Sequence, residues 1–189
     1  MTAREVSATV PDWERERLQR WFDPSRQLLR HLRGYQKRKM RGGLLGRLAL
    51  KRHVFWHRFW SAVAGADIPL NSRIEGGLLL PHPNGVVIHP DAEIGPNCLI
   101  FQQVSIGTGG PIAGFPKIGG HVDIGAGARV LGGVVVGDHA RIGANAVVLQ
   151  HVPAGATAVG VPARIIPAEE SADSGARTSG NVRQAGAPG

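Results

Sequence analysis

His82 is the residue of this 189-residue chain best suited to acid–base chemistry at a fixed position. It lies in the segment Leu80-Pro81-His82-Pro83-Asn84-Gly85, where two prolines restrict the backbone and favour a fixed imidazole. Histidine has an ordinary pKa near 6.5, so it can take a proton from an alcohol at cellular pH and make that alcohol nucleophilic. We therefore regard His82 as a candidate general base. The alternative is an ordinary histidine of a surface loop.

The segment around His82 interrupts a repeat of six residues. Aliphatic residues recur at every sixth position, except for one step of eight between Leu80 and Ile88. A helix requires a period near 3.6 and a half-buried strand a period of 2, whereas a period of six fits a short strand followed by a tight corner. Three such units form one triangular coil of about eighteen residues in a parallel β-helix. The repeat positions are Ile68, Ile74, Leu80, Ile88, Ile94, Ile100, Ile106, Ile112, Ile118, Ile124, Val130, Val136, Ile142 and Val148.

Residues 1–66 differ from this solenoid, which we place at residues 67–166. Asp12 predicts a helix N-cap, a second helix is expected from Asp23-Pro24 to about Met40, and Gly42-Gly43 should end it. A third helix is expected over residues 44–63, with a buried face formed by Leu44, Leu48, Val54, Phe55 and Phe59. Residues 167–189 are small, polar and aperiodic, so we expect a disordered tail.

The N-terminal region is strongly basic. Eleven Lys or Arg and no Asp or Glu lie between Pro24 and Ala66, and the net charge of the chain is +8. The charge fits solvated helix faces, or attraction to a coenzyme's phosphates, acidic lipid headgroups or a polyanion. Peripheral membrane contact through these helices is thus one expectation. No nucleic-acid-binding motif accompanies the charge, so we expect no nucleic-acid partner.

The remaining composition favours a cytoplasmic protein. The single cysteine, Cys98, excludes an internal disulfide framework and suits a reducing compartment. The charged start of the chain has no apolar run typical of a signal peptide, and no stretch is apolar enough to span a bilayer. Cys98 follows Asn97 in an ordinary repeat, which favours a packed thiol over an acyl carrier.

Residues 67–166 resemble the hexapeptide acyltransferases, and most closely the serine O-acetyltransferases. The resemblance is carried by Ala66-Asp67-Ile68-Pro69, by His82-Pro83-Asn84-Gly85-Val86-Val87-Ile88, by Pro116-Lys117-Ile118-Gly119 and by the closing Ala156–Ile166 segment. It implies a left-handed parallel β-helix, a mainly β fold preceded by an α-helical N-terminal segment. It also implies acetyl transfer from acetyl-CoA to the hydroxyl of serine, as in cysteine biosynthesis, with no metal required.

The resemblance further implies roles for individual residues. Asp67, fifteen residues before His82, would orient the imidazole, and Asp23 would reach the acceptor. The pantetheine arm of the coenzyme would run along solenoid edges that carry small residues, and arginines would hold its phosphates. The implied coenzyme-binding residues are Gly107, Thr108, Ala126, Ala128, Ala144, Ala146 and Arg164, with Arg129 and Arg141 as further phosphate candidates.

The sequence also departs from the serine acetyltransferases. Pro81 replaces an Asp before the histidine, Pro90 replaces a Glu, and Gly114-Phe115 replace an Arg-His pair. Phe115 is therefore a candidate acceptor-binding residue in a less charged site. This keeps a second acceptor class open: a sugar, a polysaccharide unit or a natural-product alcohol. The terminal Gly189 is not the Ile that docks into cysteine synthase, so we expect no such complex.

The sequence gives less support to two functions of other kinds, a zinc hydratase and a non-catalytic scaffold. A zinc hydratase would require three converging ligands, and the solenoid histidines His82, His89, His121, His139 and His151 lack the expected spacing. A non-catalytic scaffold would leave His82 without a role. The resemblance also implies that the flat sides of the prism pack around a threefold axis, so we expect a homotrimer with its sites between subunits, and the short N-terminal region favours the trimer over a larger assembly.

Overall fold

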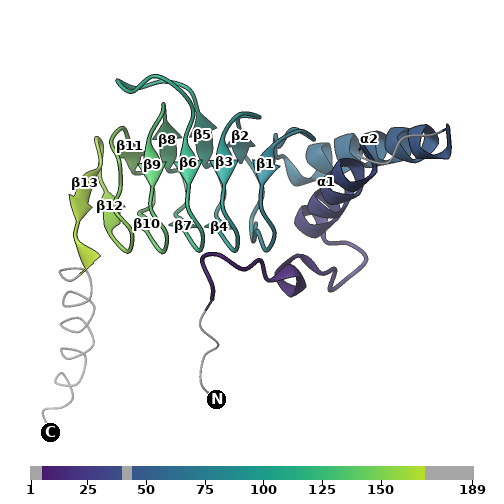
Figure 1. Cartoon of the computed structure of the whole chain (residues 1–189), viewed down its shortest axis with the longest axis horizontal. Coiled ribbons are helices and arrows are strands. Elements are labelled where there is room, and N and C mark those ends of the chain that lie inside the picture. Colours follow the sequence, from purple (N-terminus) through teal and green to yellow (C-terminus); the bar gives the residue numbers. More distant parts are fainter. Residues whose placement is uncertain (1–5, 40–43, 169–189) are drawn as a thin grey trace, which may run out of the picture.

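The structure, a computed structural model, describes residues 6–39 and 44–168. Two helices lie at one end of an elongated solenoid, and the N-terminal arm runs beneath the first coils (Figure 1). The predicted break at Gly42-Gly43 and nearly all of the predicted disordered tail lie outside the described residues. No helix in the described ranges is long and apolar enough to cross a lipid bilayer.

The helical region begins with a single 3-10 turn, η1 (Trp13–Glu16), which Asp12 caps by accepting a hydrogen bond from the backbone N–H of Glu14. The helix α1 spans Pro24–Lys39 and α2 spans Leu44–Ala64, in agreement with the predicted ranges. The two helices approach closely at Gly34, where an added Cβ would lie 2.3 Å from the His53 ring. Glycine at this position therefore allows the imidazole of α2 to pack directly on the backbone of α1.

The predicted buried face of α2 is wrong. Leu48, Phe55 and Phe59 are 70%, 64% and 46% exposed, Val54 is half-buried, and the side chain of Leu44 lies outside the described part of the chain. The buried stripe consists instead of His53, His57, Trp60 and Ala64. Helical periodicity fits both stripes, and packing against α1 selects the one that carries histidines.

Thirteen short strands wind into a prism with three parallel faces, a left-handed β-helix as the sequence predicted. The strand order is β1-β3-β6-β9 on one face, β2-β5-β8-β11 on the second and β4-β7-β10-β12-β13 on the third, where only β13 runs antiparallel. The strands are β1 Arg73–Ile74, β2 Val87–Ile88, β3 Glu93–Ile94, β4 Leu99–Ile100, β5 Ser105–Gly107, β6 Lys117–Ile118, β7 Asp123–Ile124, β8 Arg129–Leu131, β9 Val135–Val136, β10 Arg141–Ile142, β11 Val147–Val148, β12 Thr157–Val159 and β13 Arg164–Ile166.

The repeat residues fill the prism, with one exception. Thirteen of the fourteen are buried, whereas Ile112 is partly buried in the loop between β5 and β6, which projects at the top of Figure 1. Strand pairing shows the insertion, because Ile94 pairs with Ile118, twenty-four residues further on, instead of eighteen. The expectation that Ile112 is a solenoid position is therefore wrong: the inserted loop is as long as one repeat and leaves the phase intact.

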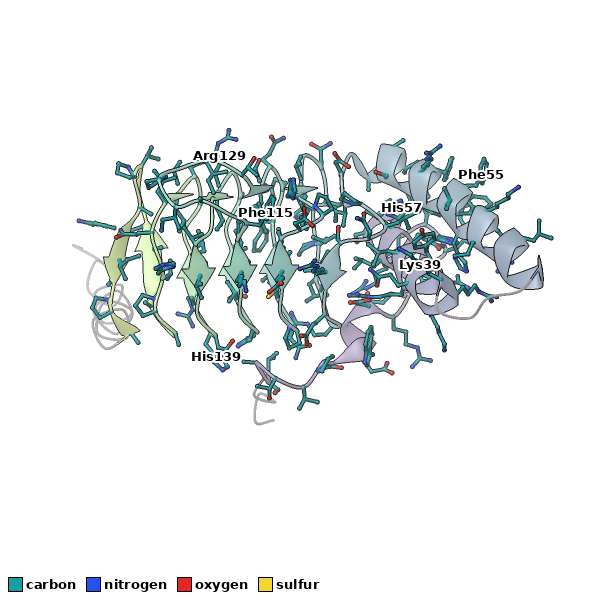
Figure 2. All side chains as sticks on the ribbon, turned by 45° about the horizontal axis from the view of Figure 1, so that its top comes forward. Lys39, Phe55, His57, Phe115, Arg129 and His139 are labelled. Carbon is teal, nitrogen blue, oxygen red and sulfur yellow. The ribbon has the colours of Figure 1, made fainter. Side chains whose placement is uncertain are left out.

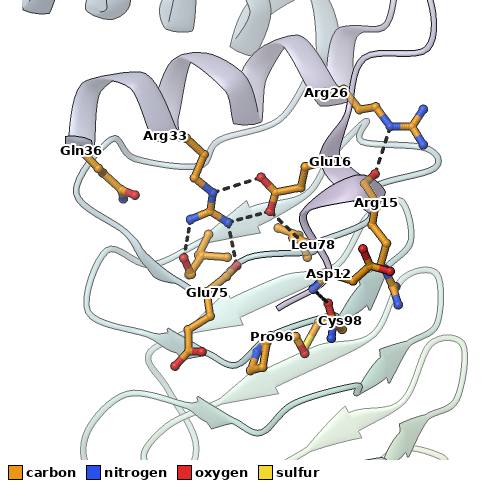
Figure 3. Close-up of polar contacts among 12 residues, drawn as sticks. Asp12, Arg15, Glu16, Arg26, Arg33, Gln36, Glu75, Leu78, Pro96 and Cys98 are labelled. Atoms are coloured by element: carbon orange, nitrogen blue, oxygen red, sulfur yellow. Dashed lines mark hydrogen bonds and ion pairs between the residues drawn. The ribbon is translucent and has the colours of Figure 1, made fainter. Parts of the chain in front are cut away.

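An ion-pair cluster fastens the helical region to the first coil (Figure 3). Arg33 of α1 donates to both carboxylate oxygens of Glu16 in η1, and also to the backbone carbonyls of Ile74 and Glu75. Glu16 in turn accepts a hydrogen bond from the backbone N–H of Leu78. Because these groups come from three separate segments, the cluster fixes where α1 begins relative to the solenoid.

Candidate active site

His82 lies in an exposed loop that leads into β2, at the point where the coil contains two extra residues. The loop is held from both sides. The N–H of Gly85 donates to the carbonyl of Gly65 at 2.7 Å, and the N–H of Gln103 in the next coil donates to the carbonyl of Asn84 at 2.9 Å. The imidazole is therefore presented at the surface from a fixed backbone, as the sequence predicted.

His82 shares a pocket of about 500 Å³ with the beginning of the helical region. The polar groups in its lining include the carboxylate of Asp23 and the guanidinium groups of Arg20 and Arg26. Phe22 and Val63 add apolar surface. The complete lining is Gln19, Arg20, Phe22, Asp23, Pro24, Ser25, Arg26, Val63, Ala64, Pro81, His82, Pro83 and Asn84. A pocket of this size, with both charge signs next to an imidazole, can hold a small polar molecule.

Asp23 has a structural role as well. Its carboxylate accepts hydrogen bonds from the Ser25 hydroxyl and the Arg26 backbone N–H at the start of α1, and it pairs with the Arg26 guanidinium at 2.9 Å. Arg20 makes no ion pair or hydrogen bond within the described residues. Arg20 is thus an uncommitted cation in the His82 pocket. Sequence reasoning did not select it, because the basic stretch was counted only from Pro24 onward.

Asp67 does not contact His82 within this chain. Its backbone lies beside Val87, with the N–H donating to the Val86 carbonyl and the carbonyl accepting from the Ile88 N–H. The Asp67 side chain lines a different pocket, together with His57, and no hydrogen bond joins it to His82 among the described residues. The predicted orienting contact is therefore absent from the single subunit, because register places Asp67 beside β2 and not beside the preceding loop.

One corner of the prism continues directly from the His82 loop. The corner residues stack through backbone hydrogen bonds: Gln103 N–H to Asn84, Gly127 N–H to the Gln102 carbonyl at 2.9 Å, and Asn145 N–H to the Ala126 carbonyl at 2.8 Å. Ala126 is half-buried and Ala144 exposed, and their coils are in register through Ile124 and Ile142. The predicted stacking of Ala126 and Ala144 is confirmed, on the same corner as His82.

Two of the proposed coenzyme contacts are wrong. Ala128 and Ala146 are both completely buried inside the prism. Each precedes an inward repeat residue by two positions, Val130 or Val148, and side chains two apart on a strand point to the same side. Their methyl groups consequently face the core and not the edge.

Gly107, Thr108 and Phe115 lie across the β2-β5-β8-β11 face from His82, at the edge where its strands finish. Gly107 closes β5, Thr108 begins the projecting loop, and Phe115 ends it. The Phe115 ring stacks on His89, with centroids 4.5 Å apart and planes at 20°. Because His89 follows β2 whereas His82 precedes it, these residues do not line the His82 pocket of their own chain.

The arginines predicted to hold phosphates are exposed. Arg129 lies on β8 and Arg141 on β10, which belong to different faces of the prism, and Arg164 lies on the antiparallel strand β13 opposite Val159. A further cavity of about 720 Å³ lies beneath Ala8 and Thr9, along β1, β3 and β6, and includes none of the predicted site residues.

The histidines form two close pairs that spacing did not reveal. The Nδ1 atoms of His121 and His139 lie 2.8 Å apart at one corner, and those of His31 and His53 lie 3.1 Å apart between the helices. Among the described side chains, no group of three or more His, Cys, Asp or Glu could hold a metal ion. Cys98 is buried in the core, and burial raises the pKa of its thiol to about 12.

Comparison with known proteins agrees with this architecture. The bacterial transferase hexapeptide family (six repeats) matches residues 115–150. Serine acetyltransferase 1, chloroplastic, of Arabidopsis thaliana is 38% identical over 146 residues, covering 68% of this chain and 46% of that protein. The serine acetyltransferase of Synechococcus elongatus is 42% identical over 106 residues, covering 55% of this chain and 43% of that protein. The chain thus spans about half the length of the curated relatives it matches.

Solved structures give the same result. Soybean serine acetyltransferase complexed with serine superposes with a TM-score of 0.64 at 34% identity, covering 77% of this chain and 58% of that one. A serine acetyltransferase in complex with CoA gives a TM-score of 0.62 at 32% identity, covering 77% and 57%. Residues 115–150 therefore match the bacterial transferase hexapeptide family, and the solenoid of this chain is similar in sequence and structure to that of the serine acetyltransferases.

Proposed function

We propose that this protein transfers the acetyl group of acetyl-CoA to the hydroxyl of serine. The observation that carries the proposal is the pocket in which His82 lies beside Asp23 and Arg20. A carboxylate and an uncommitted guanidinium on the walls can bind the ammonium and carboxylate groups of an amino acid. The departures at Pro90 and Gly114-Phe115 removed such groups from the solenoid, and the helical region supplies them.

His82 acts as the general base in the proposed reaction. It takes the hydroxyl proton as the serine oxygen attacks the thioester carbonyl, and the tetrahedral intermediate collapses with cleavage of the carbon–sulfur bond. His82 then gives the proton to the departing thiolate, so the products are O-acetylserine and CoA. The pantetheine arm lies along the corner of Ala126 and Ala144, which continues from the His82 loop.

The proposed assembly is a homotrimer. His82 lies at the edge of the β2-β5-β8-β11 face where its strands begin, and the loop that contains Phe115 lies at the opposite edge, where these strands finish. Closure around a threefold axis can bring the loop of one chain against the His82 corner of the next. Gly107, Thr108 and Phe115 then contribute to a neighbour's site. The small, charged substrates fit a cytoplasmic enzyme.

A second acceptor class follows from the stacking of Phe115 on His89. Two parallel rings present an apolar surface of the kind on which the face of a sugar ring can lie. We therefore retain a sugar or another non-amino-acid alcohol as the alternative acceptor for the same chemistry.

A thiol-release assay distinguishes the acceptors. Purified protein with acetyl-CoA is tested with serine, homoserine and simple sugars, and free CoA is followed with a thiol reagent. Because Cys98 is buried, the protein's own thiol should contribute little background. Release above the hydrolysis background with serine supports the proposal, whereas release only with a sugar selects the alternative.

The role of His82 is tested by His82→Gln, for which we expect a loss of on the order of 100-fold or more in turnover. His151→Gln is the matched control, since His151 is an exposed solenoid histidine outside the pocket, whose Nδ1 accepts from the Val135 N–H. Equal losses in the two variants would contradict a catalytic role for His82.

A further inference from the structure

The helix α2 carries an apolar stripe on the side away from the protein. Leu48, Phe55 and Phe59 are separated by seven and four residues, which places them on one face of the helix. Trp56 and Val63 extend this stripe at its margin and are 39% and 41% exposed. Figure 2 shows Phe55 projecting away from the molecule, whereas His57 lies on the side of α2 toward α1.

Among the described residues α1 packs against the opposite side of α2, and it reaches the stripe only at the margin, where Trp56 stacks on His31 with ring centroids 6.2 Å apart. The inner stripe, His53, His57, Trp60 and Ala64, is buried there. Surface helices of globular proteins normally carry polar side chains on the outer face. A second apolar stripe with two phenylalanines and a tryptophan therefore indicates contact with something outside the chain.

Basic side chains flank the stripe on both sides. Lys51 and Arg58 lie along one margin and Arg52 along the other, as the helical period of 3.6 requires. Neither α1 nor α2 contains an acidic residue. An apolar centre with basic margins is the pattern of a helix that lies in the plane of a membrane surface.

A pocket at the start of the described part of α2 has the same character. Its lining consists of Arg38, Lys51 and Arg52 together with Leu48 and Ala49, and its volume is about 480 Å³. Three cations next to apolar side chains suit a phosphate-bearing headgroup whose acyl chains continue over the stripe.

We propose that this outer face of α2 docks onto an anionic phospholipid bilayer. Charge complementarity favours the bilayer over pairing with the same face of a second copy, because that pairing would bring two sets of basic margins together. The apolar stripe enters the boundary of the acyl chains, and the flanking Lys and Arg side chains reach the headgroup phosphates. This docking surface adjoins the His82 pocket at Val63, whereas Leu48, Lys51, Arg52, Phe55 and Phe59 lie outside that pocket, and it does not depend on the acceptor.

Vesicle co-sedimentation of the full chain tests the proposal. We expect at least about tenfold stronger binding to vesicles of phosphatidylcholine with phosphatidylglycerol than to phosphatidylcholine alone, and weaker binding as salt is raised. The double variant Phe55→Ser/Phe59→Ser and the double variant Lys51→Glu/Arg52→Glu should each lose about tenfold or more of this binding.

Two matched controls lie on the N-terminal arm, one before its 3-10 turn and one directly after it. Val10→Ser removes an exposed apolar side chain, and Arg17→Glu reverses an exposed charge, so both should bind as the wild type does. Far-UV circular dichroism checks that each variant is folded, and the charge variant keeps the test valid if the serine variant unfolds.

Three outcomes would overturn the proposal. The first is equal or absent binding to the two kinds of vesicle. The second is a lower sedimentation coefficient of the α2 variants without vesicles, which would show that a second copy covers the face. The third is full competition by soluble glycerophosphate at the lipid phosphate concentration, which would show an anion site without bilayer docking.

Discussion

The guanidinium group of Arg33 holds the carboxylate of Glu16 through two hydrogen bonds, from Nε at 3.1 Å and from Nη2 at 2.8 Å. Both side chains are largely buried, and Nη2 also donates to the Glu75 carbonyl at 2.6 Å. This pair joins α1, η1 and the first coil. Because Asp23 lies at the start of α1 and His82 on the solenoid, the pair also sets the geometry of the proposed active site.

Arg33→Ala should therefore destabilise the protein and impair turnover together. Removing one partner of a buried ion pair leaves the other charge uncompensated, and we expect the free energy of unfolding to fall by about 3 kcal/mol. Arg30→Ala is the control on the same helix, where the side chain is exposed, and it should change stability by less than about 0.5 kcal/mol. Urea denaturation measures the free energy of unfolding of both variants. Equal stability of the two variants would contradict the role of the cluster.

Asp23→Asn separates the binding role of Asp23 from its structural role. Asparagine caps helices as well as aspartate does, so α1 should begin as before. Loss of the negative charge should raise KM for serine by about tenfold or more, because the ammonium group loses its partner. Steady-state kinetics measure this change, with the exposed Glu14→Gln as control. An unchanged KM for serine would show that Asp23 only caps the helix.

The corner and the core of the solenoid should respond differently to the same substitution. Ala144→Leu places a bulky side chain on the exposed corner, and we expect KM for acetyl-CoA to rise by about tenfold with the melting temperature unchanged. Ala146→Leu overfills the prism and should cost about 1–3 kcal/mol of stability. Ala154→Leu, at an exposed position of another corner, is the control. A normal KM for Ala144→Leu would exclude that corner as the coenzyme path.

Stability should fall as the pH is lowered from about 6.5 to about 4. Burial, with nearby His53 and Arg30, lowers the pKa of His31 to about 4, and burial also lowers the pKa of His53 and His57. The unfolded chain therefore binds more protons than the folded chain in this range, which favours unfolding. Above pH 6.5 these groups are neutral in both states and the slope should vanish.

His31→Gln should flatten this pH dependence, because it removes the group whose pKa is lowered to about 4. Melting temperatures of the wild type and the variant are compared at intervals between pH 4 and pH 7. Tyr35→Phe, a substitution on the same helix that removes no histidine, is the control and should keep the wild-type slope. An equal slope in all three proteins would place the acid sensitivity elsewhere.

The fold could be predicted from the repeat, but the inserted loop could not. A period of six survives an insertion of six, so Ile112 kept the phase while leaving the prism. Ala128 and Ala146 were assigned to the coenzyme edge because the pantetheine arm requires small side chains along its path, although the two-residue period of a strand places them beside Val130 and Val148 in the core. Only the strand register, which the structure provides, distinguishes these cases.

The site could be predicted in part. His82 was identifiable from the prolines and the step of eight, whereas its proximity to Arg20 depends on how the helical region folds back onto the solenoid. The same packing decided which stripe of α2 is buried, since the His53 stripe and the Phe55 stripe both satisfy helical spacing. Spacing along the sequence predicts that α2 is a helix, but only its contacts with distant segments of the chain decide which of its faces is buried.

The hydrogen-bonded corner that begins at the His82 loop also has a fixed spacing from one coil to the next. Neighbouring strands are about 4.8 Å apart, so three steps from Asn84 to Asn145 span about 14 Å along the prism axis. Insertions and deletions can change the length of this corner only by whole coils, because a partial coil would break the register of every face. The length of an extended molecule that can bind along this edge therefore changes in steps of one coil.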